Sequence, residues 1–186
     1  VKKSLMIVDM PFNTYKNKSQ ALKNCKKVIK ETKCDGIKLE GGSKIKDIIK
    51  HLVKNKIPVM GHIGITPQSQ RGKFRYKGKN EKEKKNLLND SKILEEAGVF
   101  AIVLECIEKK LSKKITETIE IPTIGIGSSK FCDGQILVLD DLLGLTNSKI
   151  KFVKKYANFK SNIRNAVKKF GSDVKRGSYP SLKHSY

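Results

Sequence analysis

The sequence predicts a parallel α/β fold and, within that class, a (β/α)₈ TIM barrel. Short apolar runs typical of strands alternate with stretches of helical periodicity along most of the 186 residues. Each strand run ends in a polar residue or a glycine, as strands do at the face of a barrel that holds the active site. A doubly wound sheet is disfavoured, because no G-x-G-x-x-G motif follows any predicted strand.

Six strands are expected, at residues 5–8, 36–39, 58–61, 100–104, 123–126 and 135–139. Helices are expected at residues 19–33, 43–55, 81–97, 110–119, 149–156 and 161–173. We expect one domain over residues 1–186, with a partial barrel at about 1–145 and C-terminal helices and a tail at about 146–186. Because a closed barrel has eight strands, we expect the first two βα units to be missing from this chain.

The net charge is +22, from 40 Lys+Arg against 18 Asp+Glu. Such a charge would suit a basic nucleic-acid-binding module. Only four of the basic residues are arginines, however, and the lysines are spread over every predicted helix, so we expect no nucleic-acid partner. No apolar run approaches the roughly 18 to 20 residues of a membrane span, and no signal peptide is visible. We therefore expect no membrane partner and a cytoplasmic location.

Four cysteines, at positions 25, 34, 106 and 132, form no C-x-x-C pair and no zinc-ligand spacing. We expect them to be reduced, with at most a packing role.

Five ionisable residues stand at or near the ends of the expected strands: Asp9, Lys38, Glu40, His62 and Glu105. Lys38 and Glu40 are two apart on one strand and should face the same side, with Leu39 opposite. Each residue alone has an ordinary structural interpretation: a capping aspartate, a salt bridge between strands, a structural histidine, or a glutamate paired with a lysine. Together they indicate metal-assisted chemistry on a small anionic substrate, with Glu105 as a buried proton acceptor.

A turn at residues 125–129, G-I-G-S-S, could also hold an anion on its backbone N–H groups. Glycine-rich turns at strand ends are common, so this second indication is weak.

Six motifs occur in order along the chain: D-M-P-F at 9–12, K-L-E-G-G at 38–42, G-H-I-G-I-T-P-Q at 61–68, L-E-C at 104–106, I-P-T-I-G-I-G at 121–127 and C-D-G-Q at 132–135. Together they resemble the 3-methyl-2-oxobutanoate (ketopantoate) hydroxymethyltransferase family over essentially the whole chain. The resemblance implies a barrel of the phosphoenolpyruvate/pyruvate superfamily. It also implies transfer of a one-carbon unit from 5,10-methylenetetrahydrofolate to α-ketoisovalerate, giving ketopantoate for pantothenate and coenzyme A synthesis.

The same resemblance implies a role for each of the five residues. Asp9 would bind Mg²⁺ and substrate, and Glu40 would stand in the outer shell of the metal. Lys38 would contact the substrate carboxylate, and His62 would line the substrate pocket. Glu105 would remove the proton from C3 to give a Mg²⁺-stabilised enolate. Family resemblance further implies a homo-oligomer, commonly a decamer.

This sequence departs from the family pattern at four places, and two of the departures, Lys73 where Gly is common and Asp140 where His is frequent, are mild. The family's Gly-Asp-Ser segment has no counterpart here, so an inactive, N-terminally truncated homologue is the alternative interpretation. In addition, Ser128 and Ser129 replace the usual Ala-Gly, which matters if that loop needs a positive φ at Ser129.

Overall fold

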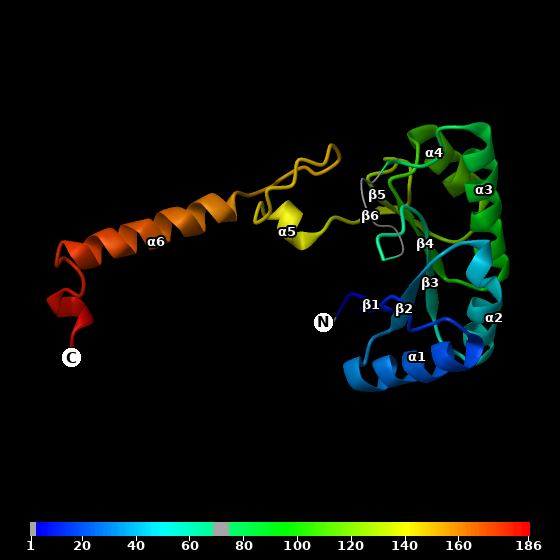
Figure 1. The fold of residues 1–186 in the computed structure, drawn as a ribbon, viewed down its shortest axis with the longest axis horizontal. Helices are drawn as coiled ribbons and strands as arrows, with labels where there is room; N and C mark the ends of the chain where they lie inside the picture. The colour runs from blue at the N-terminus through cyan, green and yellow to red at the C-terminus, as the bar shows by residue number, and fades with distance from the viewer. Residues whose placement is uncertain (1–2, 69–74) are drawn as a thin grey trace. The chain divides into compact units, whose positions relative to one another are not determined.

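The computed structural model describes residues 3–68 and 75–186, which fold into two compact units, Val1–Ile136 and Leu137–Tyr186. Among the described residues, the first unit contains one sheet of six parallel strands whose spatial order follows the chain (Figure 1). The strands are β1 (Ile7–Asp9), β2 (Gly36–Glu40), β3 (Val59–Gly64), β4 (Ala101–Glu105), β5 (Thr123–Ile126) and β6 (Gly134–Gln135). The predicted alternation is confirmed as an open half-barrel, in which β1 and β6 are the edge strands.

Four helices connect these strands and lie along one face of the sheet (Figure 1). They are α1 (Lys18–Thr32), α2 (Lys46–Lys54), which follows a 3₁₀ turn η1 (Ser43–Ile45), α3 (Glu81–Glu96) and α4 (Lys109–Thr118). Asparagine side chains cap two of them: Asn17 accepts a hydrogen bond from Gln20 N at 2.9 Å, and Asn80 accepts one from Glu83 N at 2.8 Å. These caps end the strand-to-helix loops and fix where each helix starts.

The main core lies between the sheet and the helices. Alternate strand residues point into it, among them Ile37, Leu39, Ile102 and Leu104, each with 0% exposure. Full burial of one such side chain contributes about 1.5–3 kcal/mol. The opposite face, called the inner face below, carries a smaller apolar cluster around Met60, Ala101 and Val103. The sheet therefore has a packed outer face and an inner face on which the other half of each strand's side chains lie.

The second unit contains a short helix α5 (Leu139–Leu142), a long helix α6 (Phe159–Lys175) and a 3₁₀ turn η2 (Leu182–His184). Helix α6 confirms the helix predicted at 161–173, and none of its residues is buried. The prediction that the two units form a single domain stays a prediction.

Two predictions of secondary structure are wrong. The segment 149–156 is irregular rather than helical, and only Phe152 and Val153 in it are even partly buried. A helix of eight residues is marginal without a packed face, which explains the difference. The last strand is Gly134–Gln135 instead of 135–139, because its partner β5 ends at Ile126 and the following apolar side chains are exposed.

No helix within residues 3–68 and 75–186 is both long enough and apolar enough to cross a membrane.

Candidate active site

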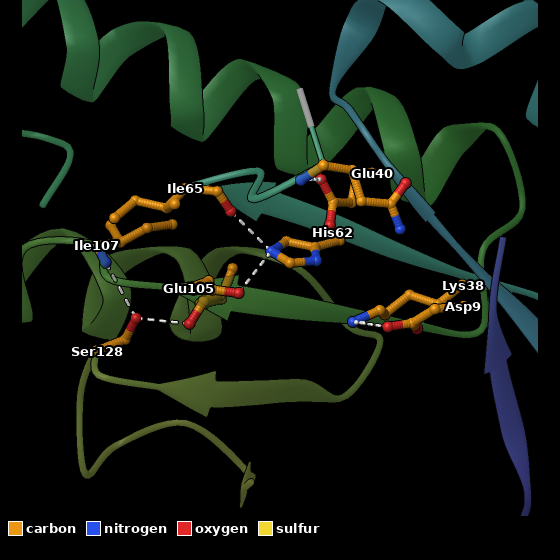
Figure 2. Close-up of polar contacts among 10 residues, drawn as sticks. Asp9, Lys38, Glu40, His62, Ile65, Glu105, Ile107 and Ser128 are labelled. Carbon is orange, nitrogen blue, oxygen red and sulfur yellow. Dashed lines mark hydrogen bonds and ion pairs between the residues drawn. The ribbon is translucent and has the colours of Figure 1, made fainter. Parts of the chain in front are cut away.

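The five predicted site residues share the inner face of the sheet, at or near the carboxyl ends of four neighbouring strands (Figure 2). They are Asp9 on β1, Lys38 and Glu40 on β2, His62 on β3 and Glu105 on β4. Parallel pairing aligns them, because Asp9 is the register partner of Lys38 and Glu40 that of His62. Leu39 points into the opposite, helix-covered core. The predicted common face of Lys38 and Glu40 is confirmed.

Asp9 and Lys38 form an ion pair at the end of β1 and β2. Lys38 Nζ lies 3.1 Å from Asp9 Oδ2, and 18% of the Lys38 side chain and 55% of the Asp9 side chain are exposed. Because more than half of the Asp9 side chain is exposed, water weakens this ion pair, and such a pair is worth only about 0.2–1 kcal/mol. The pairing is therefore easily exchanged, and both groups can reach a small anion or a cation at this end of the sheet.

Glu40 is held by the loop that follows β3. Its Oε2 accepts a hydrogen bond from Gln68 N at 3.1 Å, and the Tyr15 hydroxyl donates to the Glu40 carbonyl at 3.4 Å. Burial raises the pKa of the Glu40 carboxyl above its ordinary value, although nearby His62 and the bond from Gln68 oppose the shift. Glu40 is thus an oriented carboxylate in a partly desolvated position, where a cation would relieve the cost of its charge.

His62 and Glu105 form the buried part of the site (Figure 2). His62 Nε2 lies 3.3 Å from Glu105 Oε2 and 2.9 Å from the Ile65 carbonyl oxygen. Only 1% of the His62 side chain is exposed, against 18% of the Glu105 side chain. His62 Nδ1 is also buried, and no group in the described part of the chain hydrogen-bonds to it.

The turn after β4 fixes the backbone of Glu105. The next residue, Cys106, adopts the left-handed conformation with φ 50°, and its N–H donates to the Ile126 carbonyl at 2.8 Å. The Ser128 hydroxyl spans the same turn, donating to the Leu104 carbonyl at 2.6 Å and accepting from Ile107 N at 3.1 Å (Figure 2). The backbone is therefore held by hydrogen bonds both before Glu105, at Leu104, and after it, at Cys106.

The end of β3 approaches this turn closely. Gly64 has φ +102°, and a Cβ atom built on it would lie 2.1 Å from the Glu105 carbonyl oxygen. Any side chain at this position would separate the two strand ends. Through this close approach, Ile65 N donates to the Glu105 carbonyl at 2.9 Å.

Three residues near the site were not predicted as members of it: Tyr15, Gln68 and Ser128. Gln68 closes the G-H-I-G-I-T-P-Q motif and could have been found there. Tyr15 and Ser128 lie in loops and act on backbone carbonyls, so no strand period marks them. Ser129 is not among the positive-φ residues, so the replacement of glycine there causes no strain. An anion-binding role for residues 125–129 stays a prediction.

The four cysteines are free, as expected. Burial, together with the nearby charge of Glu105, raises the pKa of the Cys106 thiol to about 11. Cys106 is therefore a poor nucleophile despite its place beside Glu105.

The donor set on β1 and β2 suits a hard cation. No group of three or more His, Cys, Asp or Glu residues that could enclose a metal occurs within residues 3–68 and 75–186. Mg²⁺, however, is usually bound through one or two carboxylates, with waters and substrate oxygens completing the shell. Asp9 and Glu40 supply such oxygens from neighbouring strands, and burial raises the pKa of Glu40, so a cation beside this carboxylate would favour its charged form. The residues fit Mg²⁺.

Comparison with known proteins gives consistent matches. The sequence model of the family described as ketopantoate hydroxymethyltransferase matches residues 1–182. A 3-methyl-2-oxobutanoate hydroxymethyltransferase of Pelagibacter ubique (strain HTCC1062) is 60% identical over 186 residues, which are 100% of this chain and 72% of the relative. The protein of the same name from Helicobacter pylori (strain ATCC 700392 / 26695) is 50% identical over 188 residues, covering 100% of this chain and 70% of the relative.

Solved structures are more distant. A dihydrodipicolinate synthase aligns with a TM-score of 0.45 at 15% identity, covering 66% of this chain and 45% of that one, which is too remote to bear on function. The sequence comparisons are decisive by contrast, because the family model spans nearly the whole chain and the relatives are at least half identical. The chain belongs to the ketopantoate hydroxymethyltransferase family, a family of transferase enzymes.

Proposed function

We propose that this chain carries out the 3-methyl-2-oxobutanoate hydroxymethyltransferase reaction, which adds a one-carbon unit from 5,10-methylenetetrahydrofolate to α-ketoisovalerate. The product is 2-dehydropantoate (ketopantoate), a precursor of pantothenate and coenzyme A. The observation that carries the proposal is the grouping on one sheet face of a held carboxylate, Glu105, with a cation, Lys38, and two further carboxylates. These are the groups that proton removal from a 2-oxo acid requires.

Substrate binding is assigned to the ends of β1 and β2. Lys38 binds the carboxylate of α-ketoisovalerate, exchanging its exposed ion pair with Asp9 for the substrate anion. Asp9 would hold Mg²⁺, with Glu40 close by; when bound, the ion would supply positive charge that stabilises the developing enolate. Glu40 keeps its orientation through Gln68 N.

Proton removal is assigned to Glu105. Its carboxylate takes the proton from C3, and the electron pair of the broken C–H bond forms the enolate. C3 then bonds to the methylene carbon of the folate, and both bonds from that carbon to the two folate nitrogens break. Water supplies the hydroxyl group. The second proton of the water and the proton taken from C3 pass to the two nitrogens, and tetrahydrofolate leaves. Because the turn at Cys106 is tied to Ser128 and Ile126, Glu105 keeps its position while the proton moves.

The proposal extends to the assembled enzyme. Strands β1 and β6 are the two edges of the sheet, and unpaired backbone groups at an edge favour closure by further strands. We propose an eight-stranded barrel of the phosphoenolpyruvate/pyruvate superfamily as the working form. Its partners are the two substrates and other copies of the chain in a homo-oligomer in the cytoplasm, a decamer by family resemblance, without nucleic acid or membrane.

Product formation tests this proposal. The protein, as its gene encodes it, is incubated with α-ketoisovalerate, 5,10-methylenetetrahydrofolate and MgCl₂, and ketopantoate is measured by mass spectrometry. We expect product that disappears with EDTA and returns with excess Mg²⁺. A protein that melts cooperatively but forms no ketopantoate would contradict the proposed function and support the inactive homologue.

A further inference from the structure

We propose that His62 is a positioning residue for Glu105, acting through an Nε2–H group, and that it does not bind the substrate. This inference rests on the proposed function, in which Glu105 removes the C3 proton. It differs from the role that family resemblance implies for His62, which is to line the substrate pocket.

The neighbours of Nε2 determine where the imidazole proton lies. Nε2 is 2.9 Å from the carbonyl oxygen of Ile65 and 3.3 Å from Oε2 of Glu105. A carbonyl oxygen only accepts hydrogen bonds, so Nε2 carries a proton and donates it to Ile65. The carboxylate oxygen of Glu105 lies within ion-pair distance of the same N–H group. The Ile65 carbonyl thereby fixes the tautomer, as a backbone acceptor commonly does for a functional histidine.

The same three residues form a closed set of contacts. Ile65 N donates to the Glu105 carbonyl at 2.9 Å, while the Ile65 carbonyl accepts from His62, whose Nε2 also faces the Glu105 carboxylate. The backbone of Glu105 is therefore hydrogen-bonded to the residue that follows β3. Its carboxylate lies against His62 of β3 (Figure 2). Two attachments of this kind orient a carboxylate better than either does alone.

Burial separates the two roles that His62 could have. Only 1% of its side chain is exposed, whereas Glu105 is 18% exposed, so Glu105 is the member of the pair that reaches the open inner face. The second ring nitrogen, Nδ1, is buried as well and offers no atom to a ligand at the surface. The contacts and the burial thus favour a role behind the base.

Substitutions that move the N–H group test this role, with exchange of the C3 proton of α-ketoisovalerate as the readout. The amide nitrogen of His62→Gln lies near the place of Nε2, while that of His62→Asn lies nearer Nδ1, and His62→Leu has no donor. We expect His62→Gln to keep kcat within about tenfold, and His62→Asn and His62→Leu to lose about 10²-fold in kcat with KM within about threefold. His51→Gln, a histidine on α2, is the control and should change neither constant.

Two kinetic outcomes would overturn the inference while wild-type exchange is present. One is a rise in KM at unchanged kcat in the His62 variants, which would assign His62 to substrate binding. The other is an equal loss of kcat in His62→Gln and His62→Leu, which would mean that an N–H group at the position of Nε2 does not support turnover. Absence of exchange in the folded wild-type protein would instead count against the proposed function.

A spectroscopic measurement decides the tautomer without any activity. The chain has three histidines, so ¹⁵N-histidine labelling with spectra of His51→Gln and His184→Gln, both at sites outside the pair, assigns the His62 ring by elimination. We expect a proton on Nε2 of His62, and a change in that signal in Glu105→Gln. An Nε2 that carries no proton would overturn the inference.

Discussion

The two polar pairs on the inner face, Asp9–Lys38 and His62–Glu105, differ most in how far water reaches them. At the ends of β1 and β2, Asp9 is 55% exposed and its partner Lys38 is 18% exposed. At the ends of β3 and β4, His62 is 1% exposed and Glu105 is 18% exposed. Water weakens the first pair, so its members can change partners at little cost. The second pair is largely enclosed, and its carboxylate is kept in one place.

Glu40 lies between these two regions and shares features of both. Glu40 lies on β2, as Lys38 of the open pair does, and it is also the register partner of the enclosed His62. Its carboxylate is partly buried and accepts a hydrogen bond from Gln68 N. The comparison fits the proposed function, in which the open strand ends would bind ligands and the enclosed strand ends would hold the base. Substitutions on the two sides of the inner face test that division of roles.

Replacing Glu105 should have the largest effect on turnover. Glu105→Gln removes the proton acceptor but keeps an oxygen that can accept from His62, so ketopantoate formation should fall by about 10²–10⁴-fold. The melting temperature should change by about two degrees or less. A variant that retains more than a tenth of wild-type turnover would show that the enclosed pair does not supply the base.

Replacing Asp9 should have a smaller effect that depends on metal concentration. Asp9→Asn keeps the size of the side chain but loses the charge, so we expect about a 10–100-fold rise in the Mg²⁺ concentration for half-maximal turnover. The matched control is Glu117→Gln, which removes an exposed carboxylate paired with Lys113 on α4. An unchanged Mg²⁺ dependence in Asp9→Asn would exclude Asp9 as a metal ligand.

Replacing Glu40 should change stability in a pH-dependent way. Burial raises the pKa of Glu40, so the folded state binds this proton more tightly than the unfolded state, and stability falls as the pH rises through the folded pKa. Without metal, Glu40→Gln should therefore melt higher than wild type at pH 7, with the difference vanishing below about pH 4. A difference of the same size at both pH values would contradict this explanation.

Replacing Ser128 should have the smallest effect. Ser128→Ala loses two hydrogen bonds to the turn after β4, which cost about 0.5–1.5 kcal/mol each and lower the melting temperature by several degrees. Turnover should fall by less than about threefold, because Ile126 and Ile65 still hold the backbone of Glu105. Ser91→Ala, which removes a buried hydroxyl bonded to Leu88 O, is the control for stability alone. A loss of turnover in Ser128→Ala as large as that in Glu105→Gln would contradict the expectation that Ser128 contributes little to turnover.

The regular part of this site could be predicted from the sequence. Side chains on a strand alternate between faces, and parallel strands end at the same edge, so Lys38, Glu40 and Glu105 could be placed together from their positions alone. His62 followed from the same rule. The alternation of strand side chains between the two faces of the sheet therefore predicted most of the site residues.

The remaining features depend on contacts that have no period. Tyr15 and Ser128 reach backbone carbonyls from loops, and the close approach at Gly64 depends on the path of two strand ends. The helix expected at 149–156 is absent because its local sequence pattern is helical but few of its side chains are buried. Tertiary packing decided these cases.

The most direct test of the central claim is exchange of the C3 proton of α-ketoisovalerate in D₂O, followed by proton NMR without folate. The inner face should catalyse Mg²⁺-dependent loss of the C3 signal in the wild-type protein, and EDTA or Glu105→Gln should abolish it. Exchange that persists in Glu105→Gln, or its absence from a folded wild-type protein supplied with Mg²⁺, would contradict the assignment of Glu105 as the base.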